Sequence, residues 1–303
     1  MRFRFARKDK TAFYWSYFTS KVFGLWFEVK TPKLRMFLYE MLYSAAKLLN
    51  STSLLPSPFR VELVETVFGT FKVRLGTADL ASASPAFERK DVDYLLTLIG
   101  GLRHKAKRVL FLDIGADIGT FSVSVGNRFN APGSVRVMAF EPAPTSFALL
   151  EENIRLNGLE AVTELHNLAL YDRDGLELDF TFNVRAPGSS GISAAPADSE
   201  RHTRQTVMTR TLDSVVKNRL SDYDAVVFKM DVEGVEREVL EGARQVIQTA
   251  VQSGIALYVM VEDFVKPSIV AYLEESGAEF LAKVTPYNSW WRYVASPSPN
   301  ARP

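Results

Sequence analysis

From residue 108 onward, apolar segments of strand length alternate with segments of helical periodicity, and this alternation restricts the possible folds most strongly. Apolar strands that alternate with helices predict a mainly parallel sheet covered by helices on both faces. The chain of 303 residues is long enough for one such domain with an added N-terminal segment. The predicted strands are 108–115, 134–141, 161–170, 224–231 and 255–263; the predicted helices are 120–128, 144–157, 235–249 and 266–276.

Further elements flank this core in the sequence. Two strands near 278–284 and 291–294 are expected to form an edge hairpin, and "RVELVETV" and "FKVRLG" are expected to form another through Gly69. Helices are predicted over 11–27, 33–49 and 87–99. The small, polar segment 184–204 is predicted to be a loop, and loops of that length are usually functional or disordered.

The sequence divides into an N-terminal helical extension (1–57), a main domain (58–296) and a frayed tail (297–303). Residues 1–50 are rich in aromatic residues and hold ten Lys and Arg against three acids, whereas the whole chain carries +1. A basic, aromatic segment suits an interface. Two alternatives remain open: the extension contacts a membrane or lipid, or it packs on the core or on a second subunit of a homo-oligomer.

Composition limits the compartment and the partners. The chain has no cysteine, so it has no disulfide, thiolate zinc site or cysteine nucleophile. It shows neither a convincing signal peptide nor the roughly 18 consecutive apolar residues of a membrane span. We expect a cytoplasmic protein, with membrane association through residues 1–50 as the open alternative. The body lacks a basic stripe, so no nucleic-acid partner is expected.

A glycine turn flanked by acids follows the first of these parallel strands. In "VLFLDIGADIGTF", Gly115 and Gly119 allow a ligand to approach the backbone, while Asp113 and Asp117 would repel a pyrophosphate. The next strand ends in Glu141, which is placed to accept hydrogen bonds from ribose hydroxyls. A ribose ligand with cationic groups is therefore expected, which favours S-adenosylmethionine over a nicotinamide dinucleotide.

The second chemical motif is "FKMDVEGVE", in which an apolar strand ends at acids. Asp231 is the first candidate for a general base that orients and deprotonates an acceptor hydroxyl, and Glu233 is the second. Lys229 could pair with one of them or contact substrate. The competing interpretation is that both acids cap the following helix.

Other candidates at the strand ends are weaker. His166 is expected to be a packing residue or a backbone partner, and Glu262 could face the acceptor. Acids crowd these strand ends, but the sequence shows no spaced ligand set, so no metal is predicted.

In order and approximate spacing, several motifs together resemble the FkbM family of methyltransferases. They are "FLDIGADIGTFSV", "AFEPAPTSFALLEENIRLNGL", "LALYDRDG", "SSGIS", "RTLDSVV" and "FKMDVEGVEREVLEGA", and they cover roughly residues 108–245. The family usually has Asn where this chain has Asp117, a change that adds a charge. Residues 1–60 fall outside the resemblance.

The resemblance implies an α/β class I methyltransferase fold with a Rossmann-like, seven-stranded sheet that binds S-adenosylmethionine over the strand ends. By motif, Asp113, Gly115, Ala116, Asp117 and Gly119 should line the methionine portion, and Glu141 should hold the ribose. Leu168 and Ala169 should lie near the adenine, and the loop 187–193 should border the acceptor pocket.

The leading hypothesis is an O-methyltransferase that acts on a hydroxyl of a sugar, glycolipid or secondary metabolite. The basic, aromatic extension makes a lipid-linked glycan attractive as the acceptor. The alternatives are a nicotinamide-dependent oxidoreductase, disfavoured by the acidic glycine turn, and a cofactor-binding scaffold without catalysis, disfavoured by the intact Lys229, Asp231 and Glu233.

Overall fold

The structure is a computed structural model that describes residues 60–104, 108–131, 133, 135–192, 202–263 and 267–294, together with 37, 38, 41–43 and 45. The predicted helix 11–27 and the predicted tail 297–303 lie outside the described residues. Within the predicted helix 33–49, the described residues are helical.

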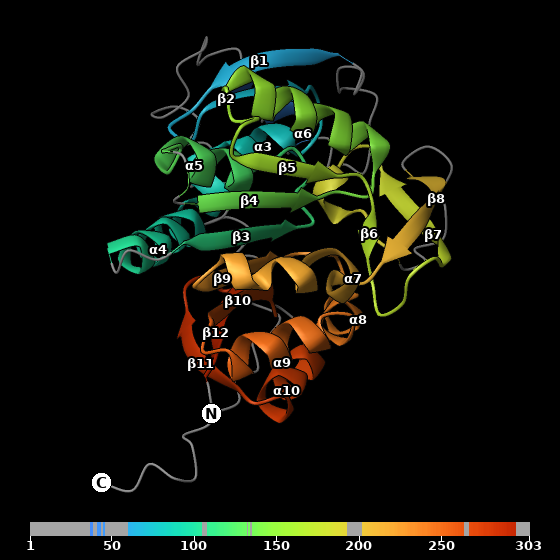
Figure 1. The fold of residues 1–303 in the computed structure, drawn as a ribbon. Coiled ribbons are helices and arrows are strands. Elements are labelled where there is room, and N and C mark those ends of the chain that lie inside the picture. Colours follow the sequence, from blue (N-terminus) through green and yellow to red (C-terminus); the bar gives the residue numbers. More distant parts are fainter. Residues whose placement is uncertain are drawn as a thin grey trace, which may run out of the picture.

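The centre of the molecule is a seven-stranded sheet with the order β11-β12-β10-β9-β3-β4-β5 (Figure 1). Strands β5, β4, β3, β9 and β10 run parallel, and β12 is antiparallel to both β10 and β11. The predicted mainly parallel sheet is confirmed, although the last strand begins earlier than expected, at Asn288. The bounds are β3 (Val109–Ile114), β4 (Val135–Phe140), β5 (Thr163–His166), β9 (Ala225–Met230), β10 (Ala256–Glu262), β11 (Ala278–Lys283) and β12 (Asn288–Tyr293).

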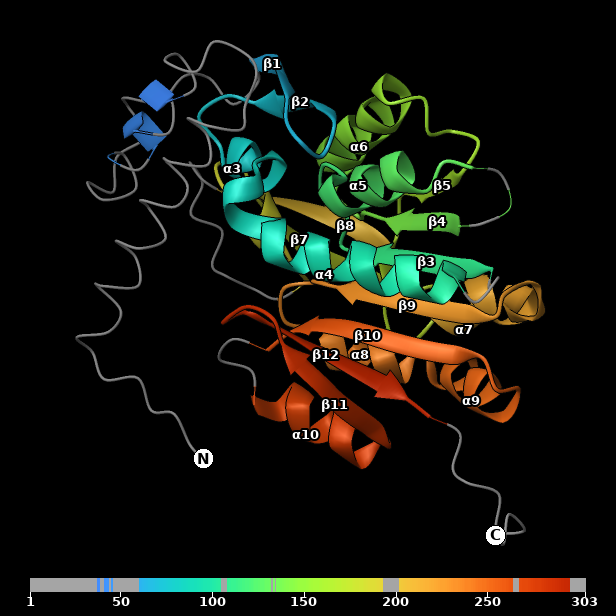
Figure 2. The same ribbon diagram turned by 90° about the vertical axis from the view of Figure 1, so that its left-hand side faces the viewer.

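Helices cover both faces of this sheet, and the two groups of helices are separate in both views (Figures 1 and 2). In β3, Val109 and Phe111 pack into one apolar cluster, whereas Leu110, Leu112 and Ile114 pack into the other. Successive side chains of a strand point to opposite faces, so burial on both faces explains the unbroken apolar run. One layer contains α3 (Asp79–Ala83), α4 (Pro85–His104), α5 (Thr120–Arg128) and α6 (Pro144–Leu156); the other contains α7 (Leu212–Val216), η2 (Lys217–Asp222), α8 (Glu236–Glu241), α9 (Arg244–Gln252) and α10 (Pro267–Glu275).

The prediction of one continuous helix over 235–249 was wrong. The helix breaks at Gly242 into α8 and α9, because the backbone there lies against Tyr171: a Cβ at Gly242 would be 2.0 Å from the Tyr171 carbonyl oxygen. The Asp213 carboxylate then accepts hydrogen bonds from the backbone N–H groups of Gln245 and Val246 at the start of α9. These contacts were not visible in the sequence because they join residues far apart in the chain.

The predicted strand 161–170 was also wrong in part, since only β5 belongs to the main sheet. The Asn167 side-chain amide donates to the carbonyl oxygens of Glu141 and Pro142, which bends the chain over the end of β4. The following residues form β6 (Ala169–Leu170), which pairs with β8 instead.

A second, three-stranded sheet lies beyond the carboxyl ends of β3, β4 and β5 (Figure 1). It has the order β6-β8-β7, with β7 (Glu177–Asn183) antiparallel to β8 (His202–Arg210), and the 3₁₀ turn η1 (Pro187–Ser189) follows β7. The predicted loop 184–204 therefore ends earlier than expected, because β8 begins at His202. Residues 193–201 lie outside the described residues. This small sheet covers the end of the main sheet where the predicted site residues gather.

The predicted N-terminal hairpin is present as β1 (Val61–Glu65) and β2 (Thr70–Arg74). The free edge of β2 is bound by two asparagines of the α6 segment. The side chain of Asn153 bonds the backbone N–H and carbonyl of Lys72, and that of Asn157 bonds those of Thr70. The hairpin is thereby fixed to α6, which packs on the main sheet.

Candidate active site

A cavity of about 360 Å³ opens at the carboxyl ends of β3, β4, β9 and β10. The small sheet contributes Phe180 to its wall, and the segment after β7 contributes Pro187 to Ser190. Nine of the eleven residues predicted for the site line this cavity: Gly115, Ala116, Asp117, Glu141, Leu168, Ala169, Lys229, Asp231 and Glu233. The other two, Asp113 and Gly119, lie behind its wall.

The glycine turn between β3 and α5 passes directly against the end of β9. Gly115 has φ 76°, and a Cβ there would lie 1.9 Å from the Asp231 carbonyl oxygen. Gly119 has φ 92°, and its Cβ would lie 2.6 Å from Leu150. Both positions need a residue without a side chain. The turn therefore joins the predicted cofactor residues to the predicted catalytic acid through backbone contact.

Asp113 is fully buried beneath the turn. Its Oδ2 accepts hydrogen bonds from the backbone N–H of Ser122 (3.0 Å) and from the Ser122 hydroxyl (2.6 Å). A carboxylate that binds N–H groups in the first turn of a helix stabilises that helix end. In this structure, Asp113 orders the turn from behind and does not border the cavity.

Lys229 is a buried cation between the acids after β9 and the glycine turn 115–119, which is called the cofactor turn below because its residues are those predicted to bind the cofactor. Its Nζ donates to the Gly115 carbonyl oxygen at 2.6 Å and lies 3.6 Å from Asp113 and 3.9 Å from Asp231. It also lies over the Phe121 ring, 5.3 Å from the centroid. A buried ammonium needs such charged and polar partners. These contacts place the Lys229 ammonium between the glycine turn and the end of β9.

Glu141, at the end of β4, presents a nearly buried carboxylate to the cavity. Its two oxygens accept hydrogen bonds from the backbone N–H groups of Asp117 (2.9 Å) and Ala143 (2.8 Å). Burial, together with the neighbouring charge of Asp117, raises the pKa of Glu141 to about 8. Each carboxylate oxygen can accept a further hydrogen bond, so Glu141 can bind ligand hydroxyl groups.

Asp117 borders the cavity from the glycine turn in a left-handed conformation, with φ 47°. Asp and Asn tolerate this region better than most side chains. Its Oδ1 accepts a hydrogen bond from the Ser146 hydroxyl at 2.9 Å and lies 3.5 Å from Nη2 of Arg74. Burial and the charge of Asp79 raise the pKa of Asp117 to about 6, against the opposing effect of Arg74.

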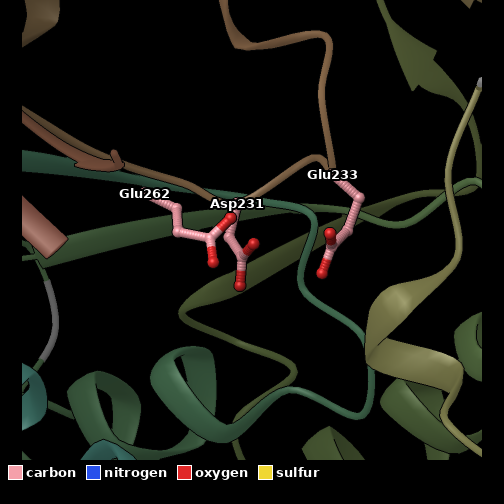
Figure 3. Close-up of side chains that lie close together, drawn as sticks. All are labelled: Asp231, Glu233 and Glu262. Carbon is pink, nitrogen blue, oxygen red and sulfur yellow. The ribbon is translucent and has the colours of Figure 1, made fainter. Parts of the chain in front are cut away.

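Three carboxylates gather at the other end of the cavity. Asp231 follows β9, Glu233 lies two residues further, and Glu262 ends β10; their closest oxygen atoms all lie within 4.8 Å of one another. Figure 3 shows the three side chains projecting to the same side of the chain. The parallel register explains this gathering, because Val261 pairs with Met230 and the next residues emerge side by side.

This group of acids has the donor atoms of a divalent-cation site. No such set was recognised in the sequence, because Glu262 is close to Asp231 only through the pairing of β9 with β10. The same acids can also accept hydrogen bonds from the hydroxyl groups of a ligand. Glu233 takes φ 53°, and Gly191 packs against it, since a Cβ at Gly191 would lie 3.0 Å from the Glu233 carbonyl oxygen.

Asp231 and Glu233, for which helix capping is the alternative role, precede the N-cap of α8 and stand outside its first turn. The N-cap residue is Val235, which makes no side-chain capping bond, and the acids of the first turn are Glu236 and Glu238. Glu236 is bound to the backbone N–H of Gly234 at 3.2 Å. The helix therefore has acids of its own near its N-terminus.

His166 does not line the cavity. Its ring stacks on Phe140 with 4.7 Å between centroids, and burial lowers its pKa. This placement agrees with the packing role expected from the sequence. Sequence reasoning missed Arg74, Ser146 and Asn288, of which Asn288 lines the cavity beside Glu262. None of them belongs to a motif, and no local signal distinguished them.

Comparison with known proteins identifies the region that holds this site. Residues 113–280 match the model of the methyltransferase FkbM domain, which is more than half of the chain. A "Methyltransferase 1" of Beauveria bassiana is 31% identical over 146 residues, covering 43% of this chain and 57% of that protein. The methyltransferase sdnD of Sordaria araneosa is 27% identical over 202 residues, covering 55% and 72%.

A solved structure described as a SAM-dependent methyltransferase from Agrobacterium tumefaciens also matches. The match covers 78% of this chain and 70% of that one, with a TM-score of 0.41 and 11% identity. Likeness at this distance assigns neither a substrate nor a residue role.

Proposed function

Because the chain belongs to the FkbM family of S-adenosylmethionine-dependent methyltransferases, we propose that it transfers a methyl group to a hydroxyl of a small acceptor. The observation that carries this proposal is the backbone contact between Gly115 and Asp231, which puts a carboxylate beside the cofactor turn within one cavity. The acceptor class is a sugar, a glycolipid or a secondary metabolite. The family match also favours this reading over a nicotinamide-dependent oxidoreductase.

The residues of the cavity fit the cofactor. Gly115 and Ala116 offer a close backbone approach, Asp117 offers a negative group, and Glu141 offers a hydrogen-bond acceptor suited to ribose hydroxyls. Leu168 and Ala169 offer an apolar wall for the adenine. The acidic character of this wall suits a ligand with positive charge and opposes a pyrophosphate.

When bound, S-adenosylmethionine supplies a methyl group made electrophilic by its positively charged sulfur. The protein must orient the acceptor hydroxyl and accept its proton. We assign the proton to a carboxylate oxygen of Asp231, since the backbone of this residue lies against Gly115 and its side chain remains about one-third exposed within the cavity. Glu233 and Glu262 would bind further hydroxyl groups of the acceptor.

Lys229 contacts both the cofactor turn and the proposed base. Its ammonium bonds the Gly115 carbonyl and lies 3.9 Å from the Asp231 carboxylate, so it attracts that acid and helps to fix its position. The proposal therefore keeps Lys229 as a positioning residue and does not give it a step of its own.

The experiment is a screen for adenosylhomocysteine formation across pools of sugars, glycolipids and secondary metabolites, preceded by calorimetry with S-adenosylmethionine and NADH. We expect binding of the first and none of the second. Binding of NADH alone would contradict the proposal. Cofactor binding without methyl transfer to any pool would favour the non-catalytic scaffold.

We further propose that residues 1–57 attach the enzyme to an anionic lipid surface and so bring it to a lipid-linked glycan. The support is the excess of basic and aromatic residues in this segment. Among the described residues, no helix combines the length and apolar character needed to cross a membrane. Co-sedimentation with phosphatidylserine vesicles, with and without residues 1–50, tests the idea; equal binding of both proteins would end it.

A further inference from the structure

The N-terminal hairpin brings an arginine to the cofactor turn from outside the matched family domain. Arg74 is the last residue of β2, is 7% exposed, and precedes the family match at residues 113–280. Its guanidinium binds both carboxylate oxygens of Asp79, through Nε at 2.6 Å and Nη2 at 3.0 Å. Such a two-point pair fixes the plane and position of the guanidinium.

From this fixed position, Arg74 also reaches the wall of the cavity. Its Nη2 donates to the Ser146 hydroxyl at 3.2 Å and lies 3.5 Å from Oδ1 of Asp117. Ser146 in turn donates to the same Oδ1 at 2.9 Å. The other oxygen, Oδ2, faces Gly188, where a Cβ would lie 3.6 Å away. One carboxylate oxygen of Asp117 is thus held by Arg74 of β2 and Ser146 of α6. The other oxygen is directed toward Gly188, on the opposite wall of the cavity.

The charges around Asp117 show why this contact matters. Asp117 donates its backbone N–H to Glu141, and the carboxylate of Asp79 is close enough to raise the pKa of Asp117. The cations that face Asp117 are Arg74, from β2, and Lys229, from β9. Removal of Arg74 would leave the three neighbouring acids Asp79, Asp117 and Glu141 with Lys229 as the cation that still faces them among the described residues.

We propose that Arg74 is a positioning residue for S-adenosylmethionine, which holds the Asp117 carboxylate at the cavity wall and makes the β1–β2 hairpin part of the cofactor site. This inference rests on the assignment of the Asp117 turn to the cofactor. It places a determinant of cofactor binding upstream of the region that defines the family.

The inference has a pH signature. Asp117, with its pKa near 6, loses its negative charge as the pH falls through that value, and the affinity for a ligand that carries an ammonium group should fall with it. Without Arg74, the pKa of Asp117 rises further, so the loss of affinity should move to higher pH. Glu141, with its pKa near 8, adds a separate step.

The test is calorimetric titration of the full-length protein with S-adenosylhomocysteine between pH 5 and 9. The variants are Arg74→Met, Asp117→Asn and the double variant. A matched control is Arg219→Met, which removes another two-point pair, with Glu164, away from the cavity lining. Circular dichroism and thermal unfolding verify folding. If Arg74→Met does not fold, it is replaced by the variant that combines Arg74→Met with Asp79→Asn, because this variant removes both charges of the buried ion pair.

We expect Arg74→Met and Asp117→Asn each to weaken binding at pH 7 by about tenfold, and Arg74→Met to add less than about threefold when Asp117→Asn is already present. The step near pH 6 should shift upward in Arg74→Met and disappear in Asp117→Asn, while Arg219→Met should bind like the wild type. If Arg74→Met weakened binding equally in the wild type and in Asp117→Asn, or if it did not weaken binding at all, the inference about Arg74 would be overturned while the cofactor assignment would stand. Absence of binding by the wild type would overturn the cofactor assignment as well.

Discussion

The backbone of Asp231 lies directly against Gly115, where the two halves of the site meet. Because a side chain at Gly115 would overlap the Asp231 carbonyl oxygen, the turn and the end of β9 cannot shift independently. The hydrogen bond from Asp231 N–H to the Ile114 carbonyl, at 3.1 Å, adds a second link. The position of the proposed base is therefore set by the same backbone that forms the cofactor turn.

For Asp231→Asn, we expect turnover to fall at least about a hundredfold, since an amide cannot accept the acceptor's proton. Binding of S-adenosylhomocysteine should stay within about threefold, because the backbone contacts remain. Steady-state kinetics and calorimetry measure the two effects. Asp93→Asn, an exposed acid on α4, is the control. Near-normal turnover of Asp231→Asn would remove this residue from the mechanism.

The sequence was sufficient to find Asp231 and Glu233, because each stands in a motif directly after an apolar strand. It could only suggest Glu262, whose place beside Asp231 depends on the pairing of β9 with β10. Arg74 could not be found at all, since its contacts with Asp79, Ser146 and Asp117 span 5, 72 and 43 positions and form no motif. Local pattern identifies strand ends, whereas the neighbours of each strand end are decided by topology.

At the scale of elements, α6 connects the hairpin to the cofactor turn. Asn153 is fully buried, and its side chain bonds the backbone N–H and carbonyl of Lys72 in β2 and the carbonyl of Ile118 in the turn. One amide thereby satisfies three backbone groups from two elements. A buried amide in this position has no apolar substitute, because each backbone group would lose its partner.

We expect Asn153→Ala to lower the free energy of unfolding by about 3 kcal/mol, from three lost hydrogen bonds and the groups left unpaired. Urea denaturation followed by circular dichroism measures this change. Asn218→Ala, at an exposed position of η2, should change the free energy by less than about 0.5 kcal/mol. A loss below about 1 kcal/mol at Asn153 would show that the hairpin does not depend on this side chain.

The elements predicted least well are those outside the alternating core. β7 and β8 were missed because β8 is rich in polar residues and carries little apolar signal; burial there is limited to a small cluster that includes Phe180, Phe182 and Val207. The core strands, by contrast, are buried on both faces, so they can be recognised in the sequence as continuous apolar runs.

At the scale of the whole molecule, acids collect at one end of the main sheet. Glu141 has its pKa raised to about 8 by burial and by Asp117, and Asp117 has its own raised to about 6. In an unfolded chain both groups release their protons near pH 4. Between about pH 4 and 8, the folded protein therefore binds more protons than the unfolded chain, so this contribution to stability falls as the pH rises.

We expect the melting temperature of the ligand-free protein to fall from pH 5 to pH 8 more steeply in the wild type than in Glu141→Gln, which does not titrate. Bound S-adenosylhomocysteine should raise the melting temperature more at pH 8 than at pH 5, because the ionised acids favour a cationic ligand. Differential scanning calorimetry at both pH values provides the measurement. Parallel curves for the wild type and Glu141→Gln would contradict the assigned cause.

The wall of the cavity opposite the main sheet comes from the segment after β7, whereas the glycine turn, Glu141 and Asp231 come from the main sheet itself. The segment that contains η1 can therefore change during evolution and fit new acceptors, while the residues proposed to bind the methyl donor stay the same. The same division makes residues 184–190 the natural place for library design, whereas Gly191 should be kept because it lies against the backbone of Glu233.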